Sequence, residues 1–411
     1  MKRTSVLYFG IFFILSGHIN IISYKLGIEN ISDAIIERFG NNKKRIGLIT
    51  NQTGIDQSGQ RSVDILLKKG FNITYLFGPE HGIDSTKGSF EDVQDSVDTR
   101  TKIPVVSLHK NGTGTLVPKE VLQKIDVLMF DIQDSGMRHF TYISTLLQVM
   151  KMAAAYDKYV VIFDRPNPLG VLMEGPVTQK NLKSFISIAE IPLRHGMTIG
   201  ELARYFNAYE LEKPINKLYI VKMARYDRRV GLNNRLLVPI SPGLRTIQSC
   251  LGYSFLGLLG EIGPFGIGLR TDFRYQCIVL PKKLKVPNRV WVQLYNKLKA
   301  YGINSVPHEY NDPKSNLPFR GLRLQIKDIN QVRGFGALHM ILSHFKAHGV
   351  TLSFSKYFDY AIGTSSVRKI FNEDERHTSL NGQLNAELSV FFQKAHKFFL
   401  YNPLPVPVLL D

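Results

Sequence analysis

Two short motifs in the first half of the chain carry side chains suited to acid–base chemistry. In GPEHG, Glu80 and His81 stand between glycines, which let the backbone turn sharply and let a ligand approach closely. In DIQDSGMR, Asp131 and Asp134 lie three residues apart. Paired carboxylates suit glycoside hydrolysis, in which one protonates the leaving oxygen and the other acts as nucleophile or base, and they also suit Mg²⁺. Both motifs have structural interpretations as well, because Glu80 could form a salt bridge in a turn and Asp134 could cap the next helix.

A third polar cluster, DRPNPLG, begins at Asp164 and is followed by Glu174 in MEGP. Two prolines make its backbone rigid, and Arg165 could bind a substrate carboxylate through two parallel hydrogen bonds. Internal pairing of Arg165 with Asp131 or Asp164 is an equally good interpretation. Glu174 is a further candidate carboxylate beside the same cluster.

The segments that precede these clusters have the pattern of buried strands. Continuous apolar runs are typical of strands covered on both faces, and they occur at 45–51, 72–77, 104–108, 125–133 and 159–163. Helical spacing at 61–69 and 141–156 alternates with them, which predicts a mostly parallel α/β sheet with helices on both faces. Right-handed crossovers place the strand ends at one edge, so their polar residues should share a crevice. These residues are Glu80 and His81; His109; Asp131, Gln133 and Asp134; and Asp164, Arg165 and Asn167.

The second half of the chain carries weaker signals. Thr198 with Glu201 three residues later forms a capping box for a helix over 198–206. Glycine and proline punctuate 235–265, which makes that region a candidate domain boundary. Beyond it, helices are expected at 290–301, 336–345 and 388–398 and a strand at 322–326, which indicates a second, smaller α/β domain.

Composition and missing motifs argue against several functional classes. The formal net charge is +18, but Lys and Arg are spread along the chain without a basic block, so nucleic-acid binding is not expected. Cys250 and Cys277 form no CxxC pair and the histidines are dispersed, so no metal site is expected. A Cys250–Cys277 disulfide and two free thiols both remain open. GxGxxG, Walker and GxSxG motifs are absent, so dinucleotide, nucleotide and serine-hydrolase chemistry lack support and no cofactor is expected.

The N-terminus resembles a secretory signal peptide. Lys2 and Arg3 precede an uncharged segment over 4–24, whose core at 6–15 is strongly apolar. We therefore expect an exported protein, located in the periplasm or outside the cell. If the leader is retained, it would anchor the chain to the membrane.

Several long motifs in the same order resemble the exo-β-N-acetylmuramidase family (NamZ-type) of bacterial peptidoglycan hexosaminidases. They are GLITNQTGID, LFGPEHG, FDIQDSGMRHFTYI, DRPNPLG with MEGP, and IPLRHGMTIGELA. The resemblance begins near residue 26, is dense to about residue 207 and is thinner beyond it. After the leader expected over 1–24, it implies a Rossmann-like catalytic domain over 25–240, a smaller C-terminal α/β domain over 241–411 and an active-site cleft between the two domains.

The resemblance also implies roles for individual side chains. Glu80 is the leading catalytic carboxylate, and Asp131 and Glu174 are further catalytic candidates. The substrate-binding candidates are His81, Gln133, Arg138, Tyr142, Asp164, Arg165, Asn167 and Arg270. The family's EGTN…SEGRGT stretch corresponds here to GEIGPFGIGLRT, in which Glu261 and Thr271 are candidates for retained residues and Arg270 for a replacement of its arginine.

The leading hypothesis is an exo-acting glycoside hydrolase that releases terminal β-linked N-acetylmuramic acid from peptidoglycan fragments, in cell-wall turnover or recycling. The lactyl carboxylate of this sugar would suit a cleft with Arg138, Arg165 or Arg270. The alternative is a non-catalytic peptidoglycan-binding protein on the same scaffold. The expected partners are muramic acid glycans, with no nucleic acid and with membrane contact only through a retained leader.

Overall fold

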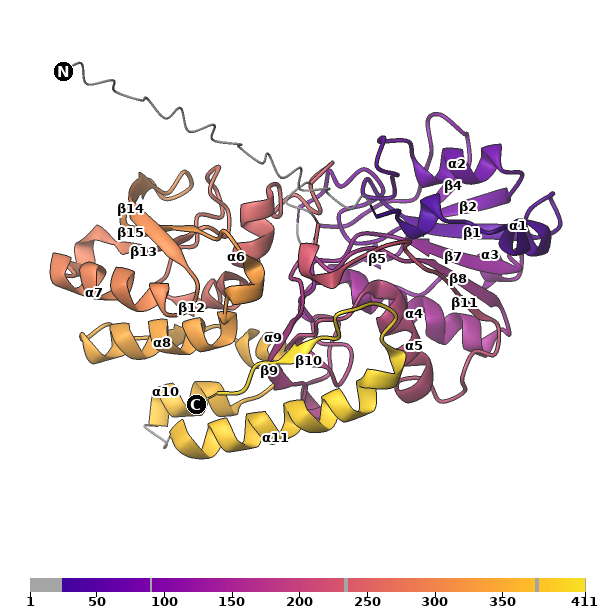
Figure 1. The fold of residues 1–411 in the computed structure, drawn as a ribbon. Coiled ribbons are helices and arrows are strands. Elements are labelled where there is room, and N and C mark those ends of the chain that lie inside the picture. Colours follow the sequence, from indigo (N-terminus) through magenta and orange to yellow (C-terminus); the bar gives the residue numbers. More distant parts are fainter. Residues whose placement is uncertain (1–23, 89–90, 233–235, 374–376, 411) are drawn as a thin grey trace, which may run out of the picture.

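The computed structural model describes residues 24–88, 91–232, 236–373 and 377–410, so the leader proposed over 1–24 lies almost wholly outside the described residues. Within them, the first half is built on a seven-stranded sheet in the order β11-β8-β7-β1-β2-β4-β3 (Figure 1). The strands are β1 (Arg45–Thr50), β2 (Asn72–Gly78), β3 (Ser96–Val97), β4 (Pro104–Ser107), β7 (Val127–Asp131), β8 (Tyr159–Phe163) and β11 (Leu218–Val221). All neighbouring pairs are parallel except β3 with β4. The predicted mostly parallel sheet is confirmed.

The strand order identifies the topology as Rossmann-like. Counted along the chain, the parallel strands from β4 to β11 follow the order 3-2-1-4-5-6. In such sheets the order reverses beside the first strand, and ligands bind beyond the carboxyl ends near that point. The ends of β1, β2, β4, β7 and β8 therefore lie at one edge, as the sequence predicted.

Alternate residues of the central strands are buried on opposite faces of this sheet. The flanking helices are α1 (Asp33–Phe39), α2 (Ser62–Lys68), α3 (Lys119–Leu122), α4 (Tyr142–Ala155) and α5 (Ile199–Tyr209). Leu128 and Phe130 of β7 belong to the core shared with α4 and α5, whereas Val127 and Met129 belong to the core shared with α1 and α2. Burial on both faces explains the unbroken apolar runs.

The second half of the described chain is smaller and contains a three-stranded antiparallel sheet in the order β13-β15-β14. Its elements are α6 (Ile247–Leu259), β12 (Ile262–Gly263), β13 (Cys277–Pro281), α7 (Asn288–Lys299), β14 (Asn304–Asn311), β15 (Pro318–Gln325), α8 (Gly334–Ala347), β16 (Ser353–Phe354), α9 (Phe358–Ile362) and α10 (Ser366–Glu373). The predicted α/β character of this half is confirmed.

Helix α6 occupies much of the glycine- and proline-punctuated region at 235–265, in which no helix was predicted. Most of its side chains are buried, and it packs against α8 and α9. A helix that is apolar on all sides shows no periodic pattern, and the glycines inside it resemble turn signals. One of them is required for packing, because a Cβ at Gly252 would lie 1.8 Å from the carbonyl oxygen of Tyr275.

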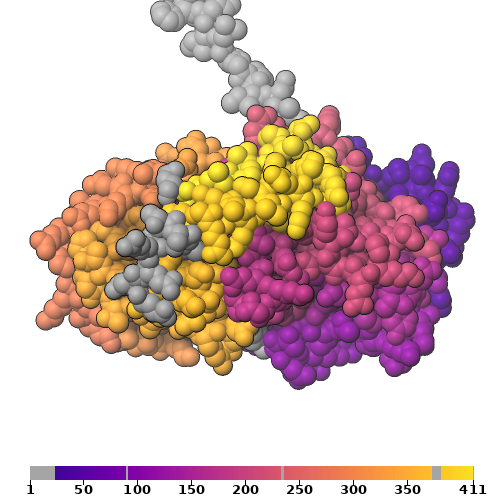
Figure 2. All heavy atoms as spheres, turned by 90° about the horizontal axis from the view of Figure 1, so that it is seen from below, coloured from indigo at the N-terminus to yellow at the C-terminus, as the bar shows by residue number. Residues whose placement is uncertain are grey.

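The end of the chain packs back onto the first half. Helix α11 (His377–Ala395) lies against β9 (Leu172–Val177), and β17 (Val406–Pro407) pairs with β9, which also pairs with β10 (Pro192–Arg194). Figure 2 shows this C-terminal stretch on one face of the molecule, where the two halves meet.

Two further observations concern the described residues alone. None of their helices is both long and apolar enough to cross a bilayer. Cys250 and Cys277 are buried free thiols, so the structure favours free cysteines over the disulfide.

Candidate active site

A cavity of about 450 Å³ lies between the two halves, which is within the usual size range of small-molecule sites. The side chains of the first half that line it include Glu80, His81, His109, His139, Phe140, Thr141 and Phe185. Those of the second half include Tyr253, Glu261, Tyr275, Tyr357 and Tyr360. Carboxylates and aromatic rings therefore face the cavity from both sides.

Glu80 reaches the cavity from a tight turn after β2. His81 and Gly82 have left-handed backbones, with φ of +74° and +83°, and the N–H of Gly82 donates to the carbonyl of Pro79. Such a conformation is uncommon for histidine, and backbone strain concentrates at functional sites. Glu80 is only 6% exposed, and the hydroxyl of Thr141 donates to its Oε2 at 2.6 Å. The carboxylate is thus held in a fixed orientation.

His81 has a defined tautomer when it is neutral. Its Nδ1 lies 2.9 Å from the carbonyl oxygen of Lys87, which can only accept, so Nδ1 carries the hydrogen. The other ring nitrogen, Nε2, is then the one that can accept a proton or a hydrogen bond.

Two further histidines in the cavity wall are buried polar groups. Within the described residues, neither ring nitrogen of His109 or His139 has a hydrogen-bond partner. Burial lowers the pKa of both rings, and it lowers the pKa of His139 to about 3, so His139 is neutral at physiological pH. Helix α6 approaches this ring closely, since the ring of Tyr253 lies 4.6 Å from it in a tilted arrangement and a Cβ at Gly257 would lie 2.6 Å from its Nε2. Buried polar groups normally have partners, so these rings are candidates for ligand contact.

Glu261 brings a second carboxylate to the cavity from the opposite half. It stands just after α6, where Ser355 donates to its carbonyl through N–H at 2.8 Å and to its Oε2 through the hydroxyl. Burial raises the pKa of Tyr253 and of Tyr275, the latter to about 12, and the charges of Glu261 and Glu80 raise both further. The two carboxylates therefore act on the same pair of phenols.

Asp131 and Arg165 do not line the cavity, which corrects their predicted roles. Arg165 donates to both carboxylate oxygens of Asp131, at 2.6 and 2.8 Å, and Ser62 donates to the same carboxylate. Both side chains of the pair are almost completely buried. The internal pairing that the sequence left open is the one observed, and it joins β7 to the loop after β8.

Asp164 and Asn167 also stabilise the fold away from the cavity. Asp164 accepts hydrogen bonds from Thr198, Gly200 and Tyr401, so it anchors the start of α5. Burial raises its pKa to about 6. Asn167 donates to the carbonyl of Met197 and accepts from the N–H of Leu169.

Three more predicted binding residues point into the protein. The guanidinium of Arg138 is fully buried and donates to the carbonyls of Pro176, Ile191 and Ala361. The amide of Gln133 donates to the carbonyls of Asp134 and Pro166. The hydroxyl of Tyr142 donates to the backbone carbonyl of Ile240. Asp134 accepts from the N–H of Gly136, so it supports the turn after β7 and does not cap α4, whose N-cap is Thr141.

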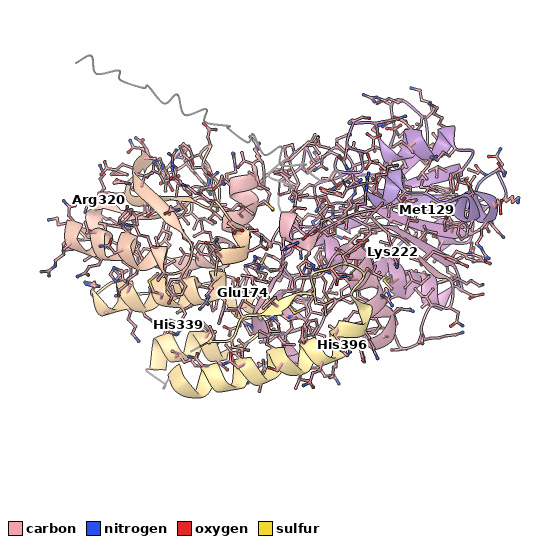
Figure 3. All side chains as sticks on the ribbon, viewed as in Figure 1. Met129, Glu174, Lys222, Arg320, His339 and His396 are labelled. Atoms are coloured by element: carbon pink, nitrogen blue, oxygen red, sulfur yellow. The ribbon has the colours of Figure 1, made fainter. Side chains whose placement is uncertain are left out.

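Glu174 and Arg270 complete the corrections. Figure 3 labels Glu174 near the middle of the molecule, where it pairs with the buried Arg194 at 2.8 Å. It also accepts the N–H groups of Gly334 and Phe335 at the start of α8. Arg270 is exposed and pairs with Asp312 at 3.3 Å, outside the cavity lining. Of the three carboxylates proposed as catalytic, only Glu80 lines the cavity.

Sequence reasoning missed most of the aromatic wall. Tyr253, Tyr275, Tyr357 and Tyr360 come from segments in which no motif was recognised, and only Glu261 had been noted as a candidate. Among the described residues, no three His, Cys, Asp or Glu side chains are grouped to hold a metal ion.

Comparisons with known proteins agree with this architecture. The family described as "Exo-beta-N-acetylmuramidase NamZ, N-terminal" matches residues 46–248. A DUF1343 family protein of Bacteroides fragilis has a similar structure, with a TM-score of 0.81 and 30% identity over 92% of this chain and 99% of that chain. The chain belongs to the NamZ-type exo-β-N-acetylmuramidase family. A second DUF1343 family protein of the same organism has a TM-score of 0.72 at 24% identity, which supports the fold.

A relative from Bacillus subtilis (strain 168) is named peptidoglycan β-N-acetylmuramidase NamZ. The chain is 39% identical to it over 221 residues, which are 53% of this chain and 52% of the relative. The match thus spans about half the length of that protein. The family match ends at residue 248, so it contains the wall with Glu80, whereas the wall with Glu261 lies in the part covered by the structural likeness.

Proposed function

We propose that this protein is an exo-acting glycoside hydrolase that releases terminal β-linked N-acetylmuramic acid from peptidoglycan fragments. The observation that carries the proposal is the approach of Glu80 and Glu261, from the two halves, to one cavity with the volume of a small-ligand site. Membership of a family of glycoside hydrolases and the name of the Bacillus subtilis relative support the same reaction.

Glycoside hydrolysis requires one carboxyl that donates a proton and a second group opposite it. In the proposed reaction, Glu80 donates its proton to the leaving oxygen as the bond to the anomeric carbon breaks. Glu261 stabilises the positive charge that develops on the sugar and deprotonates the attacking water. The 2-acetamido group of the substrate can replace water as the first nucleophile, as in substrate-assisted families.

The decisive test compares two chromogenic substrates that share one aglycone, a β-N-acetylmuraminide and a β-N-acetylglucosaminide. Release from the muraminide supports the proposal, and preference for the glucosaminide rejects the assigned substrate. Peptidoglycan pull-down without release of sugar would instead support a non-catalytic binding protein.

Two exposed tyrosines at the cavity provide a surface for the sugar that leaves. Tyr357 and Tyr360 line the cavity yet are 49% and 41% exposed, so their rings can pack on the apolar face of a second sugar. We expect Tyr357→Ala and Tyr360→Ala each to raise KM for a muramic acid–glucosamine disaccharide about two- to tenfold, with kcat little changed. Tyr209→Ala is the control, because this tyrosine is 44% exposed but lies on α5 away from the cavity. An unchanged KM in both cavity variants would contradict this contact.

A further inference from the structure

The charge of the cavity raises a problem for an acidic sugar, if the proposed function holds. Among the described residues that line it, two are glutamates and none is lysine or arginine. The arginines expected to bind the lactyl carboxylate are used elsewhere, since Arg138 and Arg165 are bonded internally and Arg270 pairs with Asp312. A muramic acid would therefore bring its carboxylate towards these acidic side chains without a compensating cation in the lining.

Two arginines that do not line the cavity stand next to lining residues in the sequence. Arg245 directly follows Leu244 and Arg274 directly precedes Tyr275, and both of these neighbours line the cavity. The two segments touch each other, because a Cβ at Gly243 would lie 3.2 Å from the ring of Tyr275. Arg245 is exposed and Arg274 is half-buried, so a ligand from solution can reach both side chains.

Neither arginine forms an ion pair with the residues that the structure describes, in contrast to Arg270. Arg245 donates through Nε to the carbonyl of Pro242 at 3.0 Å, and Arg274 donates to the carbonyl of Thr271 at 3.0 Å. One bond to a neutral carbonyl orients each guanidinium and leaves most of its five N–H donors for a ligand.

The two positive charges also repel each other. Burial lowers the pKa of Arg274, the charge of Arg245 lowers it further, and Asp272 opposes this effect without forming an ion pair. Two neighbouring cations that form no ion pair are stabilised by any carboxylate that binds to both.

We propose that Arg245 and Arg274 bind the lactyl carboxylate of a muramic acid seated in the cavity and so determine the preference for muraminides over glucosaminides. A carboxylate accepts two parallel hydrogen bonds from a guanidinium, and such charge-assisted bonds are about twice as strong as neutral ones. N-acetylglucosamine lacks the lactyl group and gains nothing from these arginines. The pair is thus a specificity determinant placed outside the catalytic carboxylates.

The test uses the full chain and the double variant Arg245→Gln/Arg274→Gln. We expect the ratio of kcat/KM for the muraminide to that for the glucosaminide to fall about tenfold or more, chiefly through KM. Added salt should reduce the wild-type ratio and leave that of the variant almost constant. Arg289→Gln is the control, because it removes an exposed charge on α7, which contributes no residue to the cavity. A ratio that is unchanged in the double variant overturns the inference.

Binding of the free sugars separates this inference from the proposed function. Calorimetry should show that wild-type protein binds N-acetylmuramic acid more tightly than N-acetylglucosamine and that the double variant loses this difference. If this binding difference is found but neither substrate is hydrolysed, the carboxylate-binding site is supported and the proposed hydrolase activity is rejected. In muramoyl dipeptide the lactyl carboxylate is an amide, so this compound should bind more weakly than N-acetylmuramic acid. If it binds as tightly as N-acetylmuramic acid and depends equally on the arginines, the peptide carboxylates are recognised and the lactyl assignment is overturned.

Discussion

Replacement of Glu80 by Gln is expected to lower kcat for the muramic acid disaccharide about 10²- to 10⁴-fold, the usual contribution of a general acid. An amide cannot transfer the proton to the leaving oxygen. It has the same shape as the carboxyl group, and its oxygen can still accept the hydrogen bond from Thr141. The fold should therefore survive, with circular dichroism and the thermal midpoint close to those of wild type.

The leaving group distinguishes proton donation from nucleophilic attack. A dinitrophenyl glycoside leaves without protonation, so the Glu80→Gln variant should hydrolyse it much better than it hydrolyses the disaccharide. A nucleophile would be needed for both substrates. Glu120→Gln is the control, because Glu120 is exposed on α3 and does not line the cavity. Normal turnover of the disaccharide by Glu80→Gln would remove Glu80 from the mechanism and leave Glu261 as the main candidate.

The parallel sheet was predictable from the sequence for a physical reason. Strands buried on both faces must be apolar at every position, and segments such as Val127–Phe130 show this directly. Right-handed crossovers then fix a common edge for the strand ends. The position of Glu80 at this edge followed from these rules.

The roles of the other strand-end carboxylates were not predictable in the same way. Asp131, Asp164 and Glu174 follow strands of the first half or lie within one, and nothing in their local sequence distinguishes them from Glu80. Their bonding partners distinguish them, but these partners are distant along the chain. Asp131 pairs with Arg165, and Asp164 accepts a hydrogen bond from Tyr401. Whether a carboxylate faces a cavity or a buried partner is decided by tertiary packing.

The cavity wall that the second half contributes was not predictable for a different reason. Helix α6 is buried on almost every side and contains glycines where neighbouring groups approach closely, so its pattern resembles a loop. Tyr253 and Glu261 depend on that helix for their position. The resemblance to a known family was also thinnest in this region.

The largest effect on stability is expected for Glu174, a carboxylate that the sequence placed in the active site. Glu174→Ala removes the ion-pair partner of Arg194, whose side chain is completely buried, and it leaves the cavity lining unchanged because Glu174 is not part of it. Breaking a buried ion pair by deleting one member costs about 3–5 kcal/mol, because the remaining charge is left without compensation. The loss of an acceptor for the N–H groups of Gly334 and Phe335 at the start of α8 adds to this cost.

Denaturant titration and kinetics together separate this structural role from a catalytic one. A structural Glu174 predicts a large fall in the free energy of unfolding and near-normal kcat in the fraction that remains folded at low temperature. A catalytic Glu174 predicts the opposite pattern, stable protein with little turnover. Asp126→Ala is the matched control, because Asp126 pairs with Arg45 at 2.8 Å on the surface, where a lost ion pair costs about 1 kcal/mol or less. Since Glu174 joins β9 to α8, a stability loss much greater than that of Asp126→Ala would show that this carboxylate stabilises the contact between the two halves that form the cavity.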